Sequence, residues 1–590
     1  MMFSAKTPNI NQLWANLIVE ELIRCGVRQF VLSPGYRCTP LTVAAAKADI
    51  AEVITHFDER GAAYYALGHA RATGKPAALV CTSGTATANY FPAVVEASMD
   101  MVPMVLLTAD RPVELRDTGA NQTIDQVELY GRYVRYSYDL PVPDEEISPE
   151  SVLAVINEAV DLALHSPQGP VHVNCQYREP LAPTSPNEQF AGYLSRLGKW
   201  LNDDQPFIKR QAVPAGISDS LAESVATVIN RAASGLLVTG PFKDSDDTVA
   251  VKKLAEQLQW PVFADIRSGL RLGANLKCVI SHFDQLLLSE KYFAMKANVV
   301  LHLGGVMTSK RYNEFVQHCR GEHYIQVADH SLCRDPNNVV TERVVARVAD
   351  FCGKLTELLN PDSAEGRLDA MMSDNESVGN MIRDEVESNA ALTEIAVARL
   401  VSRHASGNSG LFLGSSMPIR DMNSYAAGDG PPIGATANRG ASGIDGSIAT
   451  AVGWAAGRKT PVTAVIGDLA FLHDVNSLML MKNNGQPVTL IVINNNGGGI
   501  FSLLPIHDCG DVFEKYFGTP HNLSFERITG AFDLDYYRPE STGTFVRLYE
   551  QAQKSKRPSV IEIVTNREEN REAHFTLQNK IKALVDTGKK

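Results

Sequence analysis

The sequence has few cysteines, and they are not spaced as a disulfide framework or a zinc site. Nine cysteines are scattered over 590 residues, with an odd count and no CxxC pair. This pattern favours reduced thiols in a cytoplasmic protein over a disulfide-stabilised secreted one. No hydrophobic run approaches the roughly 18 residues that a membrane span needs. The first 27 residues have the pattern of an amphipathic helix, not of a signal peptide. We therefore predict a cytoplasmic protein without a membrane span.

The sequence also lacks a block of positive charge. Its 55 basic and 67 acidic residues give a net charge of −12. Without a basic patch to offset this charge, nucleic acid is not an expected partner. The 44% hydrophobic and 21% charged residues are ordinary for a globular protein. Local cationic pockets for anionic small molecules remain compatible with this balance.

Short apolar runs alternate with helix-length segments along the whole chain. This alternation predicts α/β domains built on doubly wound parallel sheets with helices on both faces. Polar, proline-containing stretches around 177–220 and at 359–377 are predicted linkers, and residues 59–73 a helix. We expect three domains, at 1–185, 186–365 and 366–590. The predicted strands lie within 29–35, 52–57, 77–84, 104–110, 171–176, 235–241, 260–265, 298–305, 323–329, 411–416, 462–468, 489–496 and 560–566.

Two strand ends in the last third carry oxygen donors. Asp468 follows one predicted strand, and Asn495 ends the next, 27 positions later. Carboxylate, amide and backbone carbonyl oxygens suit Mg²⁺, which takes its other ligands from phosphate and water. The run after Asn495 is rich in glycine, so its backbone, including the Gly497 carbonyl, can approach a phosphate closely. The alternative is a simple strand-to-turn junction, where Asn and Gly are common.

Two further stretches have both a structural and a functional interpretation. Glu59 follows a predicted strand in "VITHFDERGAAYY", where it is either a first-turn helix residue or a functional carboxylate. In "NRGASGIDGSIATAVGWAAG" (438–457), small residues open a helix whose N-terminus could receive phosphate oxygens. Glycine-rich packing between a helix and a sheet is the alternative for this stretch.

Basic residues recur beside predicted strand ends, more of them than a small neutral substrate needs. Arginine suits bidentate carboxylate binding, so the set favours substrates with several carboxylates. Each residue taken singly is also compatible with a surface ion pair. The basic residues and their polar neighbours are Arg37, Arg111, Asn121, Gln122, Lys310, Arg311, Ser416 and Arg420.

The "GD" at 467–468 with "NN" about 27 residues later resembles the diphosphate–Mg²⁺ motif of thiamin-diphosphate enzymes. "GDL" stands where many members have "GDG". Six further motifs are "HFDER", "TSGTA", "LTADRPVELRDTGANQ", "SKR", "NRGASGIDG" and "NNNGGGIFSLLP". Together they resemble the motifs of one branch of these enzymes, the 2-succinyl-5-enolpyruvyl-6-hydroxy-3-cyclohexene-1-carboxylate (SEPHCHC) synthases of menaquinone biosynthesis. Tyr36 and Cys38 depart from the branch, which has serines beside Arg37.

The resemblance implies a cofactor site for thiamin diphosphate and Mg²⁺ or Mn²⁺. Glu59 would hydrogen-bond the aminopyrimidine ring, and Ile444 would hold the cofactor in its bent shape. The metal would be bound by Asp468, Asn495 and Gly497. The implied cofactor-contacting residues are Glu59, Arg439, Ser442, Gly443, Ile444, Gly467, Asp468, Leu469, Asn495, Gly497, Gly498, Ile500, Phe501 and Leu504.

The resemblance also implies the reaction: decarboxylation of 2-oxoglutarate, then 1,4-addition of the succinyl unit to isochorismate. Ser416 and Arg420 would hold the succinyl carboxylate. Asn121 and Gln122 would contact intermediates, and Ile500, Phe501 and Leu504 would form an apolar wall. The carboxylates of isochorismate would bind Arg37, Arg111, Lys310 and Arg311. Because the family places its cofactor between two chains, we expect a homodimer, or a homotetramer as a dimer of dimers.

Other hypotheses remain open at the level of sequence. A different thiamin-diphosphate decarboxylase or carboligase, such as an acetolactate-synthase-like enzyme, would not need the whole basic set. A dinucleotide-dependent dehydrogenase lacks support because no strand carries GxGxxG. A catalytically dead regulatory homologue is disfavoured by the presence of Glu59, Asp468 and Asn495. Arg267 and Arg271 in the central domain form a hypothetical site for an anionic regulator.

Overall fold

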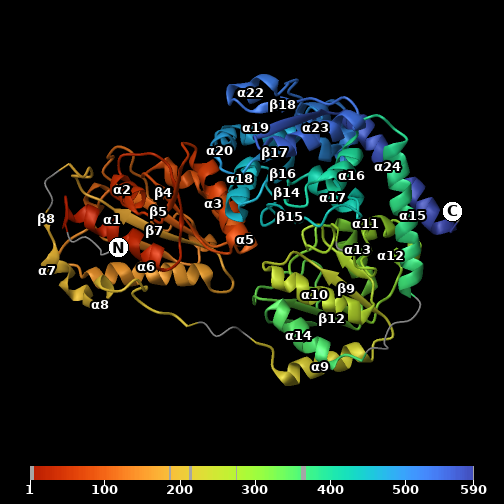
Figure 1. The fold of residues 1–590 in the computed structure, drawn as a ribbon, viewed down its shortest axis with the longest axis horizontal. Helices are drawn as coiled ribbons and strands as arrows, with labels where there is room; N and C mark the ends of the chain where they lie inside the picture. Colours follow the sequence, from red (N-terminus) through yellow and green to blue (C-terminus); the bar gives the residue numbers. More distant parts are fainter. Residues whose placement is uncertain (1–5, 185–187, 212–215, 274, 361–366, 589–590) are drawn as a thin grey trace. The chain divides into compact units, whose positions relative to one another are not determined.

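The computed structural model describes residues 6–184, 188–211, 216–273, 275–360 and 367–588. Each predicted domain contains one parallel sheet flanked by helices, which confirms the α/β fold (Figure 1). In each sheet, neighbouring strands are often not consecutive in sequence, because helices connect parallel strands by crossovers. The predicted domain boundaries themselves stay predictions.

The first sheet has six strands in the order β3-β2-β4-β5-β7-β6. Its central strands are buried along their whole length, as expected for a parallel sheet covered on both faces. The strands are β2 (Gln29–Leu32), β3 (Glu52–Thr55), β4 (Ala77–Cys81), β5 (Met104–Asp110), β6 (Ser137–Leu140) and β7 (Pro170–Gln176). The helices are α1 (Ile10–Arg24), α2 (Thr39–Lys47), α3 (Glu59–Thr73), α4 (Thr85–Asn89), α5 (Phe91–Asp100) and α6 (Pro149–Leu164).

The second sheet has five strands in the order β10-β9-β11-β12-β13. These strands are β9 (Gly235–Thr239), β10 (Val262–Ala264), β11 (Val299–Leu303), β12 (His323–Ala328) and β13 (Glu342–Val345). The accompanying helices are α9 (Asp219–Asn230), α10 (Ser245–Leu258), α11 (Phe283–Leu286), α12 (Glu290–Phe293), α13 (Lys310–Cys319) and α14 (Val348–Leu358).

The third sheet has six strands in the order β15-β14-β16-β17-β19-β18. These are β14 (Gly410–Leu413), β15 (Gly434–Thr436), β16 (Val462–Gly467), β17 (Val488–Asn494), β18 (Asp535–Tyr537) and β19 (Ser559–Val564). The helices are α15 (Arg367–Glu387), α16 (Glu394–His404), α17 (Met417–Tyr425), α18 (Ser447–Arg458), α19 (Asp468–His473), α20 (Leu478–Asn483), α21 (Asp511–Phe513), α22 (Glu526–Ala531), α23 (Thr542–Ser555) and α24 (Arg567–Thr587).

Four strands of these three sheets were not predicted, and all four lie at sheet edges. They are β6, β13, β15 and β18. Each has only three or four residues, and none is buried along its length. An edge strand is paired on one side only and can stay polar, so it lacks the apolar run that marks a central strand.

Both predicted linkers are partly wrong. In the first, β8 (Glu188–Gln189) pairs with β1 (Lys6–Thr7), and α7 (Ala191–Leu194) and α8 (Gly198–Leu201) follow. Leu194 and Trp200 belong to the hydrophobic core of the first sheet. In the second, α15 begins at Arg367 and continues past the predicted linker, while 361–366 lie outside the described residues. In both stretches, polar residues belong to the exposed faces of helices and strands and do not indicate an irregular linker.

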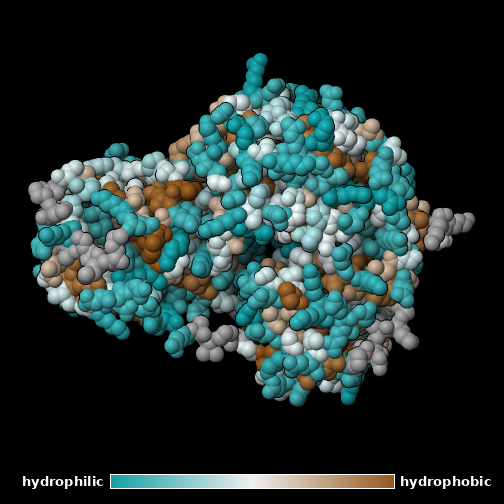
Figure 2. Space-filling model, viewed as in Figure 1, coloured by the Kyte–Doolittle hydropathy of each residue, from teal (hydrophilic) through white to brown (hydrophobic). Residues whose placement is uncertain are grey.

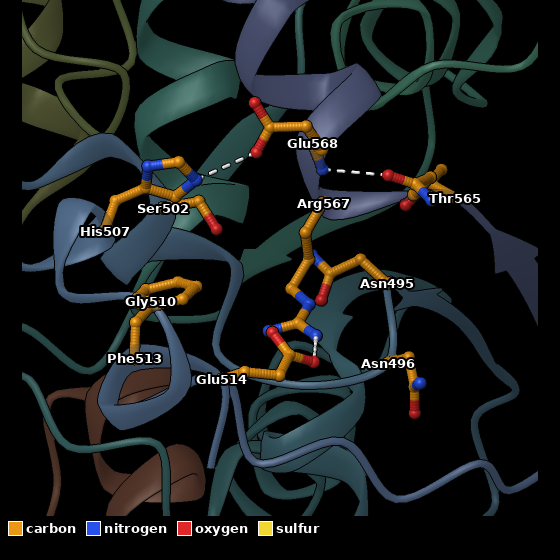
Figure 3. Close-up of a pocket in the computed structure, with 11 residues that line it drawn as sticks. Asn495, Asn496, Ser502, His507, Gly510, Phe513, Glu514, Thr565, Arg567 and Glu568 are labelled. Carbon is orange, nitrogen blue, oxygen red and sulfur yellow. Dashed lines mark hydrogen bonds and ion pairs between the residues drawn. The ribbon is translucent and has the colours of Figure 1, made fainter. Parts of the chain in front are cut away.

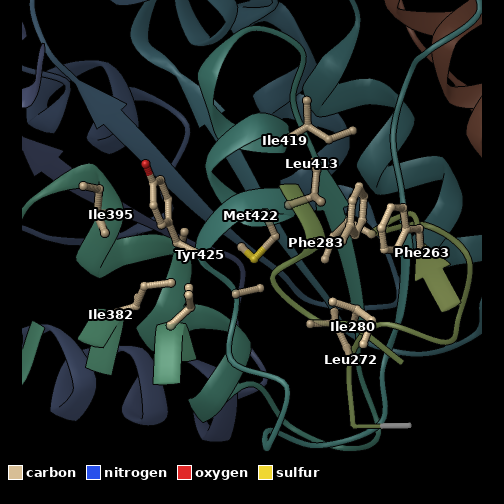
Figure 4. Packing of buried hydrophobic residues seen from close by; sticks show 14 of the residues in the cluster. Phe263, Leu272, Ile280, Phe283, Ile382, Ile395, Leu413, Ile419, Met422 and Tyr425 are labelled. Atoms are coloured by element: carbon tan, nitrogen blue, oxygen red, sulfur yellow. The ribbon is translucent and has the colours of Figure 1, made fainter. Parts of the chain in front are cut away.

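The contacts group the chain into two compact units. The first unit contains residues 1–212, 438–459 and 473–486, and the second contains 213–437, 460–472 and 487–590. In the second unit, the central and third sheets share one hydrophobic core. Figure 4 shows Phe263 and Phe283 of the central domain with Leu413 and Met422 of the third. The two phenylalanine rings stack with centroids 4.9 Å apart.

In the first unit, α3 packs against α18 through glycines. A Cβ on Gly68 would lie 2.1 Å from the carbonyl oxygen of Thr450, and one on Gly453 would lie 2.0 Å from that of Tyr65. Each helix therefore places a glycine against the backbone of the other. This finding supports the structural interpretation of the small residues in 447–457.

The described residues contain no helix that is both long and apolar enough to span a membrane. Hydrophilic residues cover most of the face drawn in Figure 2, where hydrophobic residues form separate, smaller areas. All nine cysteines lie within the described residues and are free thiols, six of them buried.

Candidate active site

The predicted metal-binding residues Asp468 and Gly497 are joined directly in the second unit. Strands β16 and β17 are parallel neighbours, so the residues that follow them meet at one edge of the sheet. The Gly497 N–H donates to Oδ2 of Asp468 over 2.8 Å. Asp468 is buried, and burial raises the pKa of its carboxyl, partly offset by the Gly497 N–H and by His521.

Gly497 occupies a position that only glycine fits. Its φ is +132°, and a Cβ would lie 1.8 Å from the carbonyl oxygen of Gly518. Its neighbour Asn496 has φ +61°, and its side-chain oxygen accepts the N–H groups of His521 and Asn522. The loop after β17 is thus hydrogen-bonded to residues 521 and 522, and Asp468 contacts both Gly497 of the loop and His521.

Asn495 presents an amide oxygen with no partner among the described residues. The residue is 8% exposed, and its Nδ2 donates to Oε1 of Glu394 over 2.9 Å. Its Oδ1 is buried and accepts no hydrogen bond. A buried acceptor without a donor is costly unless a water or an ion binds it. Together with the Asp468 carboxylate, this oxygen has the hard-donor chemistry that Mg²⁺ or Mn²⁺ requires, so the residues fit a metal.

A cavity of about 580 Å³ opens beside Asn495 (Figure 3). Asn495, Asn496 and Ser502 come from the segment after β17. Thr565 and Asn566 connect β19 to α24, and Arg567 and Glu568 begin α24. Arg567 pairs with Glu514 over 2.6 Å, and His507 lies 2.9 Å from Glu568. The volume is within the range that holds a small organic ligand.

The predicted apolar wall is only partly formed in the isolated chain. Ile500 and Phe501 are half-buried in the short 3₁₀ segment Gly499–Leu503, and Phe501 contacts Phe517 edge to face with centroids 5.6 Å apart. Leu504 is 45% exposed. Gly498 donates its N–H to the Gly518 carbonyl. Gly467 ends β16 and Leu469 lies in α19, and their contacts with a cofactor stay predictions.

Four of the predicted substrate residues meet in the first unit. Arg111 donates to Oγ of Ser83 over 2.8 Å and to the Asn121 carbonyl over 2.9 Å. Gln122 donates to the Ser83 carbonyl, and its own carbonyl accepts the Ser83 hydroxyl. Arg37 is 8% exposed and donates to the Tyr177 carbonyl. Sequence reasoning missed Ser83, although it lies in the quoted "TSGTA".

Arg37 and Arg111 are near enough for their charges to repel. Burial, and after it the charge of Arg111, lowers the pKa of the Arg37 guanidinium below its usual value. The only acidic side chain paired with Arg37 in the described chain is that of Glu179, at 3.5 Å and 61% exposed. The positive charges of Arg37 and Arg111 are only weakly neutralised by acidic side chains, so the pair favours binding of a carboxylate ligand.

Glu59 begins α3 and is half-buried. Its N-cap is Asp58, whose carboxylate accepts the N–H groups of Arg60 and Gly61. Oε2 of Glu59 accepts from Nδ2 of Asn89 over 3.2 Å. The Glu59 carboxylate is therefore only partly withdrawn from solvent in this chain.

The other four basic and polar candidates belong to the second unit. Lys310 is 86% exposed and pairs with Glu314 at 3.4 Å. Arg311 pairs with Asp284. Arg420 is exposed and donates to the carbonyl of Ser416, which has φ +74° at the N-cap of α17. The eight residues therefore form two groups, one in each unit, and their assembly into one site stays a prediction.

The glycine-rich segment 438–446 is held by carboxylates of this chain. Glu96 of α5 accepts the N–H groups of Gly440 at 2.8 Å, Ala441 at 2.6 Å and Ser442 at 3.3 Å. At the start of α18, Oδ2 of Asp474 accepts the N–H groups of Ile448 and Ala449. Several amides of this segment and of the start of α18 therefore already have an acceptor in this chain, and the predicted contacts of Ser442, Gly443 and Ile444 with a cofactor stay predictions. Gly443 and Ile444 are half-buried, as is Arg439, and Ser442 is exposed.

Four residues of these networks were not predicted from the sequence: Glu96, Glu394, Asp474 and His521. Glu96, Glu394 and Asp474 are each about 1% exposed. His521 Nε2 lies 3.1 Å from Oδ2 of Asp468. The sequence signal for these residues was a charged side chain inside an otherwise apolar or glycine-rich stretch. Such a signal does not indicate which group the side chain binds.

The hypothetical regulatory site at Arg267 and Arg271 is not supported by their surroundings. Arg271 is 1% exposed, and burial lowers the pKa of its guanidinium to about 10. Arg267 is bound to Asp265 at 3.1 Å and to the Val306 carbonyl. Neither side chain is presented to a surface ligand.

Comparison with known proteins places these features in a family. Residues 14–129 match the thiamine pyrophosphate enzyme N-terminal TPP binding domain, 191–413 the middle domain of thiamine pyrophosphate enzymes, and 423–563 the C-terminal TPP binding domain.

Curated relatives match along nearly the whole chain. A protein of Rubrobacter xylanophilus is 42% identical over 97% of this chain and 98% of its own length. Those of Prosthecochloris aestuarii and Salinibacter ruber are 43% and 42% identical, each over 98% of both chains. All three are named 2-succinyl-5-enolpyruvyl-6-hydroxy-3-cyclohexene-1-carboxylate synthase. The chain therefore belongs to the thiamine pyrophosphate enzymes and, among them, to the SEPHCHC synthase family.

Proposed function

We propose that this protein is a transferase that decarboxylates 2-oxoglutarate and adds the resulting succinyl unit to the ring alkene of isochorismate. The products are CO₂ and SEPHCHC, an intermediate of menaquinone biosynthesis. Thiamin diphosphate, when bound, supplies the electron sink that decarboxylation of a 2-oxo acid requires. The observation that carries the proposal is the unpartnered Asn495 Oδ1 beside the Asp468–Gly497 bond.

Asp468, Asn495 and the Gly497 carbonyl would hold Mg²⁺ or Mn²⁺, and the metal would bind the diphosphate. Glu59, at the start of α3, would hydrogen-bond the aminopyrimidine ring. Among the described residues, Asn89 donates to this half-exposed carboxylate, which retains capacity for another donor.

Two groups of cations would bind the substrate carboxylates. Arg37 and Arg111 would bind isochorismate, with Asn121 and Gln122 beside them. Lys310 and Arg311 would also bind the carboxylates of isochorismate, and Ser416 and Arg420 would bind the distal carboxylate of 2-oxoglutarate. The guanidinium groups of the arginines suit carboxylates because each can donate two parallel hydrogen bonds.

The active site would be completed by a second copy of the chain. In the first unit, large apolar side chains stand exposed beside Arg37, Glu59 and Arg111. They are Tyr36 at 60%, Phe57 at 55% and Val113 at 63%. Exposed apolar groups at a functional edge favour an interface. A homodimer or homotetramer in the cytoplasm, where the free thiols would stay reduced, fits this surface.

The test is a turnover assay with thiamin diphosphate and Mg²⁺, supplying 2-oxoglutarate with and without isochorismate. We expect coupled loss of isochorismate and release of CO₂, abolished in Glu59→Gln. CO₂ release that ignores isochorismate would identify a plain decarboxylase. Turnover of pyruvate instead would identify an acetolactate-synthase-like enzyme and overturn the substrate assignment.

A further inference from the structure

Two consecutive asparagines at the end of β17 are each held by a different buried glutamate. Nδ2 of Asn494 donates to Oε1 of Glu562 over 2.6 Å, and Nδ2 of Asn495 donates to Oε1 of Glu394 over 2.9 Å. Glu562 is 0% and Glu394 1% exposed. Asn494 is the last residue of β17 and Asn495 follows it directly, and the two glutamates come from different elements, Glu562 from β19 and Glu394 from α16.

The bonds differ at the other end of each amide. Oδ1 of Asn494 accepts the N–H of Asn496 over 3.2 Å, so this amide is satisfied within the protein. Oδ1 of Asn495 accepts nothing from the described residues, although it is buried. The Asn494 side chain therefore has hydrogen-bond partners at both ends, while the Asn495 oxygen can still accept a hydrogen bond or bind a cation.

The two ends of an amide have nearly the same size, so shape alone does not decide which one faces a site. A carboxylate only accepts hydrogen bonds, so it attracts the NH₂ end and repels the oxygen. With Glu394 behind it, Asn495 turns its NH₂ inward and its Oδ1 outward. Without this acceptor, the amide could turn its NH₂ toward the metal, and an NH₂ group is no ligand for a hard cation.

Glu394 is itself firmly placed. It is the first residue of α16, and Thr393 caps the helix by accepting the Ala396 N–H. The hydroxyl of Thr565, directly after β19, donates to the same Oε1 over 3.2 Å. Ile395 and Val397 on the same helix belong to the shared hydrophobic core. The acceptor therefore stays fixed relative to β17.

We propose that Glu394 is a positioning residue that orients the Asn495 amide so that its oxygen faces the bound cation. This inference rests on the proposed function, because it needs a cation at Asp468 and Asn495. Ligand-orienting partners of this kind typically change metal affinity by roughly 10–100-fold when removed.

The experiment measures binding of Mn²⁺ by electron paramagnetic resonance, using the full-length protein with thiamin diphosphate present. In Glu394→Met, which keeps the length of the side chain but no acceptor, the Kd for Mn²⁺ should rise by about 10–100-fold. In Glu394→Gln it should change less than about threefold, because the glutamine oxygen can still accept from Asn495. Glu562→Met and Glu562→Gln form the matched control pair, with lower melting temperature but near-wild-type Kd.

A double variant separates orientation from general loss of structure. In Glu394→Met with Asn495→Asp, either rotamer of the aspartate presents an oxygen, so Mn²⁺ binding should be restored. Wild-type affinity in Glu394→Met would overturn the proposal. So would equal losses in Glu394→Met and Glu394→Gln, which would indicate charge, or a double variant without rescue.

The same measurement distinguishes failure of the proposed function. If the wild-type protein with thiamin diphosphate binds no Mn²⁺, the proposed cofactor site and the positioning role are both overturned. If the wild-type protein binds Mn²⁺ and Glu394→Met binds it equally well, only the positioning role is overturned.

Discussion

The N–H of Gly497 donates to Oδ2 of Asp468 over 2.8 Å, although the two residues are 29 positions apart in the chain. The bond closes the loop after β17 onto the end of β16. The side-chain oxygen of Asn495 has no hydrogen-bond donor among the described residues. The Asp468 carboxylate and this amide oxygen therefore both lie at the ends of the neighbouring strands β16 and β17.

Asp468→Asn should abolish most metal binding. The change removes the negative charge and replaces one carboxylate oxygen by an NH₂ group that cannot bind a cation. We expect the Mg²⁺-dependent rise in melting temperature to disappear and the Kd to increase by more than about 100-fold, beyond the effect of an orienting residue. Differential scanning fluorimetry with and without Mg²⁺ measures this. Asp508→Asn, on an 82% exposed side chain, is the control and should behave as wild type.

Arg111→Met should weaken substrate binding more than it weakens folding. A hydrogen bond to a charged group contributes about 1.5–3 kcal/mol, so the KM for isochorismate should rise by roughly 10–150-fold. Arg111→Lys should recover part of this loss. The matched control is Arg178→Met, which breaks an exposed ion pair with Glu114 and should leave KM unchanged. Equal KM values in both methionine variants would remove Arg111 from the substrate site.

His574 should make stability depend on pH in the alkaline range. Its Nδ1 donates to the Asn570 carbonyl, and its Nε2 lies 2.8 Å from Oδ1 of Asp421. Burial acts to lower the pKa of His574, but the Asp421 carboxylate overcomes it and raises the pKa from 6.5 to about 9. A folded-state pKa above the unfolded value stabilises fully below pH 6.5, and the contribution is lost as pH rises through about 9.

The measurement is urea unfolding of the wild type and of His574→Gln at pH 6 and pH 9.5. The free energy of unfolding should differ between the two proteins by on the order of 3 kcal/mol more at the lower pH. The difference between the proteins removes the titration of groups that do not interact with His574; Glu394, whose pKa burial raises to about 7, interacts with His574 and contributes within the same window. Parallel pH profiles would contradict a charged His574 in the folded state.

Gly68→Ala should destabilise the packing of α3 on α18. The new Cβ would lie 2.1 Å from the Thr450 carbonyl oxygen, so the helices must separate. Overpacking of this kind costs about 1–3 kcal/mol in the free energy of unfolding. Gly353→Ala in α14 is the matched control, because a Cβ there meets nothing within 4 Å. It should stabilise by about 1 kcal/mol through helix propensity. Thermal or urea unfolding of both variants measures whether the free energy of unfolding falls in Gly68→Ala and rises in Gly353→Ala.

The central strands could be predicted because their signal is local. A buried parallel strand needs an uninterrupted apolar run, and β5 and β17 show this in their own residues. The edge strands β6 and β18 could not be predicted, since pairing on one side leaves them free to be polar. The helix over 59–73 was predicted with its observed bounds, because Asp58 and Gly74 supply its caps locally.

The candidate site was predictable as a set of residue types but not as a set of contacts. The sequence by itself determined that Asp468 and the asparagine run follow two consecutive strands, because each strand is marked by its own apolar run. Only the tertiary structure decided that the Asn494 amide is satisfied and that the Asn495 oxygen has no donor among the described residues, and that Glu96 and Asp474 accept N–H groups of the segment 440–449. Those partners come from distant segments, and which acceptor reaches which donor depends on packing that no local pattern records.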